Sequence, residues 1–163
     1  MRYVAQAVLD APVERVDLAE WLFTLTDAEY QASARGHHAA GVTVDDRGRG
    51  TVNVESVGGN LLVQHYRAVR ADPAFVEMYS PTSRAYLYHL VPVVCRVRWI
   101  LEAEPADERS SVFSCTVDVE LPPLLRLLAR VTAMPFFLRK HLVEETAGFA
   151  ADINRKLALA RAA

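Results

Sequence analysis

From residue 37 to residue 121 the chain is a succession of strand-like segments joined by turn signals, and this feature constrains the fold most. Alternating or β-branched composition predicts strands over 37–45, 51–57, 61–70, 75–80, 84–91, 93–104 and 110–121, the fifth ending at Pro92. Short turns such as Gly58-Gly59-Asn60 separate them, and turns this short join antiparallel neighbours. The pattern therefore predicts one antiparallel sheet.

Helical signals stand at both ends of this region. A strand over 2–10 leads into Pro12, which suits the first turn of a helix. The sequence predicts two short helices, one over 13–25 and one that begins at Thr26 or Asp27 and runs to about residue 34, with Glu29 near the capping-box position.

The C-terminal region predicts the longest helix. A helical segment opens at Pro122-Pro123 and continues to residue 133, Pro135 interrupts or kinks it, and a longer helix follows over 136–160. Apolar residues recur at three- to four-residue multiples and predict a face that packs on the sheet: Leu138, Leu142, Phe149, Ile153 and Leu157.

Length and composition indicate one soluble domain that spans residues 1–163. The chain is 52% hydrophobic and 23% charged, and no linker divides it. A net charge of −2 argues against a nucleic-acid surface. The N-terminus lacks the apolar run of a signal peptide, and the most apolar stretch, 85–101, carries His89, Arg96 and Arg98. We therefore expect a cytoplasmic monomer or homodimer without integral membrane association.

The two cysteines predict neither a metal site nor a disulfide. Cys95 and Cys115 lack metal-ligand spacing. A hairpin centred on Asp107 places Trp99 opposite Cys115, and a shift of two residues would keep the same faces. The cysteines then lie about 13 Å apart along the strands, too far for a disulfide. His37 and His38 are adjacent in a strand, point to opposite faces and are expected at the surface.

Alternation places one polar pair on the face that we predict to be inward. Folding residues 51–70 about either glycine-containing turn puts Val52, Val54, His65 and Arg67 on the same face. Three explanations stay open: a locally bonded His65 beside an Arg67 that reaches solvent, a polar ligand contact inside a cavity, or a bulge that reverses the face.

The following strand has two possible orientations. One points Val76 and Met78 inward and gives an apolar lining. The other points Glu77 and Tyr79 inward and would pair Glu77 with Arg67.

The order of elements, and the opening Val8-Leu9-Asp10-Ala11-Pro12-Val13-Glu14-Arg15-Val16, resemble the START-like helix-grip superfamily. That group includes polyketide cyclase/dehydratase proteins, lipid-transport proteins and the birch-pollen-allergen type. Asp17 stands where the family commonly has Trp. The resemblance implies an α+β fold in which a curved antiparallel sheet of about six to seven strands wraps around a long C-terminal helix, with two short helices after the first strand.

The resemblance also implies a cavity that binds a hydrophobic or aromatic small molecule, such as a lipid or polyketide. The candidate ligand-binding residues are Val52, Val54, His65, Arg67, Tyr79, Trp99, Cys115, Leu142 and Phe149. One alternative is a cyclase/dehydratase-like enzyme that uses His65 for acid–base chemistry. Another is a module that binds a protein partner. No cofactor or metal ion is expected.

Overall fold

The computed structural model describes residues 1–46 and 48–162, so Arg47, in the predicted turn at 46–50, lies outside the described residues. The elements follow the predicted order: β1 (Arg2–Leu9), η1 (Val13–Arg15), α1 (Leu18–Thr24), α2 (Asp27–Ser33), β2 (His37–Asp45), β3 (Gly48–Val57), β4 (Asn60–Asp72), β5 (Phe75–Leu87), β6 (Val91–Pro105), β7 (Ser111–Glu120), α3 (Pro123–Val131) and α4 (Met134–Ala162).

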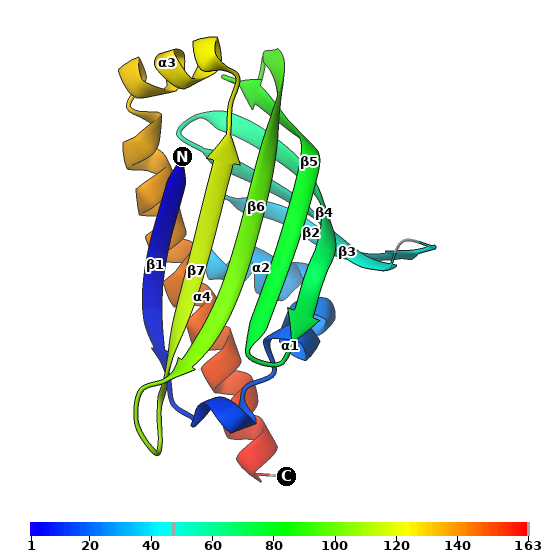
Figure 1. Ribbon diagram of the computed structural model, residues 1–163, viewed down its shortest axis with the longest axis vertical. Helices are drawn as coiled ribbons and strands as arrows, with labels where there is room; N and C mark the ends of the chain where they lie inside the picture. Colours follow the sequence, from blue (N-terminus) through cyan, green and yellow to red (C-terminus); the bar gives the residue numbers. More distant parts are fainter. Residues whose placement is uncertain (47, 163) are drawn as a thin grey trace.

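The strands form one antiparallel sheet of seven strands in the order β1-β7-β6-β5-β4-β3-β2. Sequential hairpins build it from β2 to β7, and β1 joins the far side of β7. The curved sheet closes around α4, while α2 packs against β2 and α1 against β4, β5 and β6 (Figure 1). The predicted α+β helix-grip architecture is confirmed.

The core lies between the concave face of the sheet and α4. Every second residue of β6 is buried there, including Val97, Trp99 and Leu101. Phe149 of α4 is fully buried, and its ring lies 5.1 Å from that of Trp21 on α1 and 6.0 Å from that of Trp99. These contacts bury the apolar face that the helical periodicity predicts.

The β6–β7 hairpin has the predicted faces, but its register differs by two residues. Trp99 pairs with Val117 and Leu101 pairs with Cys115. Trp99 is nonetheless buried beside Cys115, as predicted, because its Nε1–H donates to Sγ of Cys115 at 3.1 Å. Both cysteines are free thiols.

Two predicted strands are one strand in the structure. The segments predicted over 75–80 and 84–91 join as β5, which is irregular between Ser80 and Ser83. Both serines are buried, and the Ser83 hydroxyl donates to the Ser80 hydroxyl at 2.7 Å. The two buried hydroxyls at this bulge therefore form a hydrogen bond with each other. Val91 therefore opens β6 instead of ending β5.

The helix boundaries show where capping was predicted correctly. Thr26 caps α2, and the Glu29 capping box forms. The helix predicted from Val13 is only a 3₁₀ turn, and α1 starts after Asp17, whose carboxylate accepts from the Glu20 amide.

Pro135 does not kink the long helix. It lies in the first turn of α4, where the missing N–H of proline costs no helical hydrogen bond. The chain turns immediately before α4 at Ala133, which has a φ of 54°.

Gly148 sets how closely α4 approaches the α2–β2 connection. A Cβ at this position would lie 1.9 Å from the carbonyl oxygen of Ser33 at the end of α2. Only glycine permits that approach. It brings one face of α4 close to the first residues of β2, where the functional residues described next converge.

Candidate functional site

An apolar cavity of about 100 Å³ lies beneath α3, between α4 and the sheet. Its walls come from five strands and both C-terminal helices, and they include Leu62, Ala85, Cys95, Val119, Leu125 and Leu138. Buried Ala129 and the neighbouring Leu125 turn toward this space from α3, while Arg126 and Arg130 are exposed. The amphipathic α3 therefore covers one end of the cavity.

A smaller polar pocket of about 30 Å³ lies next to this cavity, and Leu138 lines both. The polar pocket is built from Tyr3, Asn53, Glu55, Gln64, Tyr66, Trp99, Val117, Leu138, His141, Leu142 and Glu145. Alternate residues of β3 and β4 supply its amide, carboxylate and phenol groups, and one turn of α4 supplies its imidazole and second carboxylate. The site thus pairs an apolar space with a polar end.

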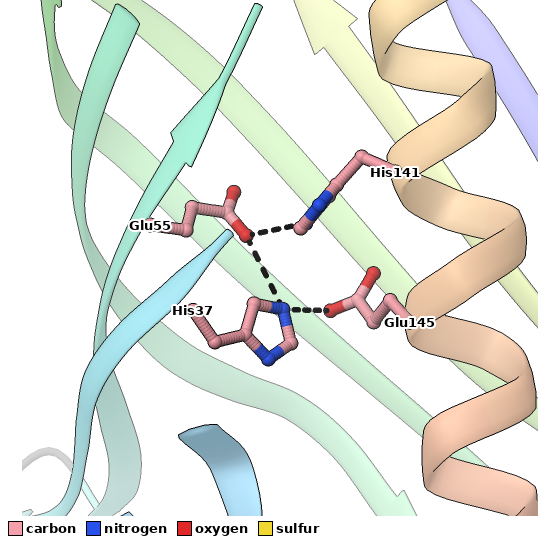
Figure 2. Close-up of side chains that lie close together, drawn as sticks. All are labelled: His37, Glu55, His141 and Glu145. Atoms are coloured by element: carbon pink, nitrogen blue, oxygen red, sulfur yellow. Dashed lines mark hydrogen bonds and ion pairs between the residues drawn. The ribbon is translucent and has the colours of Figure 1, made fainter. Parts of the chain in front are cut away.

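Four titratable side chains meet at the polar end: His37 from β2, Glu55 from β3, and His141 and Glu145 from α4 (Figure 2). Nε2 of His141 lies 3.0 Å from Oε2 of Glu55. Nε2 of His37 lies 3.7 Å from the same Glu55 oxygen and 3.6 Å from Oε1 of Glu145. The four side chains are between 0% and 12% exposed. Two imidazole nitrogens and two carboxylates are groups that can hold a metal ion.

The other ring nitrogen of His37 is fixed by α2. Nδ1 lies 2.8 Å from the carbonyl oxygen of Tyr30 and 2.9 Å from the Ser33 hydroxyl, which itself donates to the same carbonyl. A carbonyl only accepts, so Nδ1 carries the proton. The Tyr30 ring also stacks on the imidazole at 3.8 Å. These contacts aim Nε2 at the two carboxylates.

Charge and burial act together on this cluster. Burial by itself would lower the pKa of His141, but the hydrogen bond to Glu55 and the nearby carboxylates raise that pKa to about 9. Burial would raise the pKa of Glu55, yet the His141 hydrogen bond and the charges of His141 and His37 keep it below its ordinary value. Burial, then Glu55 and Glu145, hold the pKa of Tyr66 well above 10. The Tyr66 phenol is therefore a neutral hydrogen-bonding group at physiological pH.

The prediction that Val52, Val54 and His65 face inward is wrong. These residues do share a face, and β3 pairs with β4 about the Gly58-Gly59 turn, one of the two turns considered, with Val52 opposite His65. This face is the outer one. His65 is exposed and lines a groove on the outside of the sheet. The inward face carries polar groups, including Glu55 and Gln64, because partners from α4 and β2 satisfy them there.

Arg67 and Tyr79 also lie away from the cavity. Val76 and Met78 are the inward residues of β5, which leaves Tyr79 on the other face. Arg67 pairs with Asp45 of β2, and Glu77 pairs with Arg98. The pair of Arg67 with Glu77 that the second orientation required does not form.

The remaining candidates lie inside the molecule. Trp99 and Leu142 line the polar pocket. Cys115 and Phe149 are fully buried in the core beside it, where Phe149 packs on aromatic rings. A ligand contact by any of these four residues stays a prediction.

The sequence did not predict the cluster in Figure 2. His37 is buried, contrary to the surface position expected for it, whereas His38 is exposed on the opposite face. A usable signal was present in α4, because His141 and Glu145 have the i, i+4 spacing that places two ligands on one helix face. No local pattern links them to residues about 90 and 100 positions earlier.

No family model and no curated protein matches the sequence. Solved structures do match over nearly the whole chain. The Zhui aromatase/cyclase from a Streptomyces species aligns at a TM-score of 0.63 and 12% identity, covering 96% of this chain and 95% of that one. A START superfamily protein from Mycobacterium smegmatis aligns at 0.51 and 14%, covering 90% and 97%. A major latex-like protein from Panax ginseng aligns at 0.51 and 13%, covering 87% and 98%.

The chain has a START-like fold. At these identities the likeness concerns the fold and not the ligand. The cavity of this START-like chain lies between sheet and C-terminal helix, where the resemblance of its sequence implied one. Within the described residues, no helix is long and apolar enough to cross a membrane.

Proposed function

We propose that this START-like protein binds a small hydrophobic or aromatic molecule in the cavity beneath α3. The observation that supports this most is the apolar space itself, which opens beside a cluster of buried polar groups. A few convergent polar groups at one end of an apolar pocket are typical of small-molecule sites. A space of about 100 Å³ suits one ring or a short chain. A larger molecule requires α3 to move away from α4.

The polar end favours a ligand with a hydroxyl group over one with a carboxylate. Glu55 and Glu145 offer acceptor oxygens close to the pocket, and both are buried. A ligand hydroxyl can donate to them, whereas a ligand carboxylate would bring a further negative charge beside two buried carboxylates. Arg67, whose guanidinium would suit an anionic ligand group, faces outward and pairs with Asp45.

Entry is expected at the α3 end. Exposed apolar side chains lie on α3 and at the start of α4, including Leu124, Leu127, Leu128, Phe136 and Phe137. Tyr88, in the β5–β6 turn, lines the cavity and is 66% exposed, so this end of the cavity reaches the surface. An apolar molecule can therefore reach the cavity along an apolar surface.

The test is a fluorescence titration with the uncharged probe N-phenyl-1-naphthylamine in a chelating buffer. Ala129→Phe fills the cavity from α3, and Ala147→Phe adds the same side chain at an exposed position of α4. We expect Ala129→Phe to weaken binding about tenfold or more, a change of roughly 1.4 kcal/mol. Ala147→Phe should bind as the wild type does.

Competition by 1-naphthol and 1-naphthoate tests the polar end. The naphthol should displace the probe at a lower concentration than the naphthoate, because only the naphthol can donate to the carboxylates. Wild-type affinity in a folded Ala129→Phe protein would overturn the proposal. So would a wild type that binds neither the probe nor phenol, a single ring that the cavity can hold without movement of α3.

A further inference from the structure

We propose that His37, Glu55, His141 and Glu145 form a binding site for a divalent transition-metal ion, with zinc as the best fit. The ligand atoms of these four residues all lie within 4.8 Å of one another. They come from two neighbouring strands and one helix, and their side chains converge on a common point (Figure 2). This inference concerns the polar cluster alone and does not depend on a hydrophobic ligand in the adjoining cavity.

The spacing is close to that of a tetrahedral site. Zinc binds imidazole nitrogen and carboxylate oxygen at about 2.0–2.2 Å, so neighbouring ligand atoms lie about 3.3 Å apart in a tetrahedron. Three separations in the cluster are close to this value: 3.0 Å for His141 to Glu55, 3.7 Å for His37 to Glu55 and 3.6 Å for His37 to Glu145. The remaining pairs lie within 4.8 Å, so side-chain shifts of up to about 1.5 Å would close the site around an ion.

His37 supplies an independent indication. Its side chain is fully buried, and its Nε2 makes no hydrogen bond with any residue that the structure describes. Because Nδ1 donates toward Tyr30 and Ser33, Nε2 is the ring nitrogen that faces the two carboxylates. A metal ion held between Nε2 and the carboxylate oxygens would satisfy this nitrogen and both carboxylates at once. An imidazole that donates its second nitrogen to a backbone carbonyl is also the usual arrangement of a histidine ligand.

The donor set discriminates between metals. Imidazole nitrogen suits zinc and its neighbours in the transition series, whereas calcium and magnesium prefer sites made of oxygen. The charge balance also fits a divalent ion. Its two positive charges cancel the two negative charges of the carboxylates, and metal-bound imidazoles are neutral. The competing arrangement is a metal-free network in which added protons on the imidazoles balance the carboxylates.

The surroundings provide a path to the cluster and a rigid frame. Glu55, His141 and Glu145 line the polar pocket, so an ion can reach them from that side. The close approach at Gly148 holds α4 beside the α2–β2 connection that carries His37. An ion bound here would join α4 to β2 and β3.

Calorimetric titration of the chelator-treated protein with zinc sulfate tests the site directly. We expect one zinc ion per chain and a higher unfolding temperature in its presence. Glu145→Gln keeps the shape of the side chain but removes a charged ligand, so zinc affinity should fall about tenfold or more. Glu144→Gln is the matched control on the same helix turn, because Glu144 pairs with Arg35 away from the cluster, and it should leave affinity unchanged.

Imidazole ¹⁵N NMR of the wild type gives a second measurement that needs no variant. Zinc should shift the ring nitrogens of His37 and His141 and leave those of exposed His38 and His65 in place. Three outcomes would overturn the proposal: no stoichiometric zinc binding, equal affinity in a folded Glu145→Gln protein, or shifts confined to the exposed histidines. Any of these would favour the proton-balanced network, and none would bear on the test of the apolar cavity.

Discussion

Phe149 is the residue around which the aromatic core is arranged. Its ring lies within 6.4 Å of the rings of Trp21, Tyr30, His37 and Trp99, and the residue is fully buried. It therefore links α4 to α1, to α2 and to the sheet. Its position also supports one side of the polar cluster, since the His37 ring is among its contacts.

Replacement of Phe149 should destabilise the protein strongly. We expect Phe149→Ala to lower the free energy of unfolding by about 3–5 kcal/mol, because it leaves a cavity between close-packed rings. Urea unfolding followed by circular dichroism measures this change. Val143→Ala, at an exposed position of the same helix, should stay within about 0.5 kcal/mol of the wild type. A loss below about 1 kcal/mol for Phe149→Ala would mean that the ring is not packed as described.

The orientation of β3 and β4 shows why residue types alone misled the prediction of the site. Alternation correctly placed Val52, Val54 and His65 on one face, while the sequence left two turns open and the structure adopts the one that pairs Val52 with His65. The face with more valine was assumed to be inward. The actual inward face carries Glu55 and Gln64, whose burial depends on partners in β2 and α4. Such partners are distant in the sequence, and so no local pattern reveals them.

At the scale of elements, a polar junction joins α2 to α4 at the end away from α3. The Glu29 carboxylate accepts from Arg155 and Lys156 of α4, and it also completes the capping box of α2. Burial would raise the pKa of Glu29, but hydrogen bonds from Thr26 and Lys156 outweigh it and lower the pKa to about 2. The Glu29 carboxylate therefore both caps the N-terminus of α2 and holds α2 against α4.

This junction predicts a specific acid sensitivity. A carboxyl group whose pKa is lower in the folded state stabilises the fold above its ordinary pKa of about 4.5. Its contribution is lost as the pH falls from about 4.5 to about 2. Glu29→Gln should therefore be less stable than the wild type at pH 6, and the difference should shrink toward pH 2. Urea unfolding across this range measures it, and a difference that stays constant with pH would contradict the assignment.

The C-terminal helices show what proline residues can and cannot predict about helix boundaries. Pro122 and Pro135 correctly marked two helical segments, α3 and α4. The sequence did not decide between a kink and a break. The break lies just before α4, where Ala133 adopts a left-handed conformation, and it lets α3 turn across the end of the sheet (Figure 1). That turn makes α3 a cover for the cavity instead of an extension of the gripping helix.

For the molecule as a whole, the sequence predicted architecture better than chemistry. The order of the elements, the single antiparallel sheet and a long C-terminal helix packed on it followed from periodicity and turn residues, since these are local signals. The wrapping of the sheet around that helix was implied by the family resemblance. The β6–β7 register differed by two residues because both registers keep Trp99 and Leu101 on the inward face. The polar cluster needed the full topology, because it unites His37 and Glu55 with two residues of the C-terminal helix.

The central claim is that ligands bind inside the curve of the sheet, beneath α3, and not on its outer face. Methyl NMR of the protein titrated with 1-naphthol tests this claim most directly. Methyl resonances of Leu62, Leu125 and Leu138 in the cavity should shift, while those of Val63 and Val94 in the outer groove near His65 should stay unchanged. Shifts confined to Val63 and Val94, with the cavity leucines unmoved, would contradict the claim.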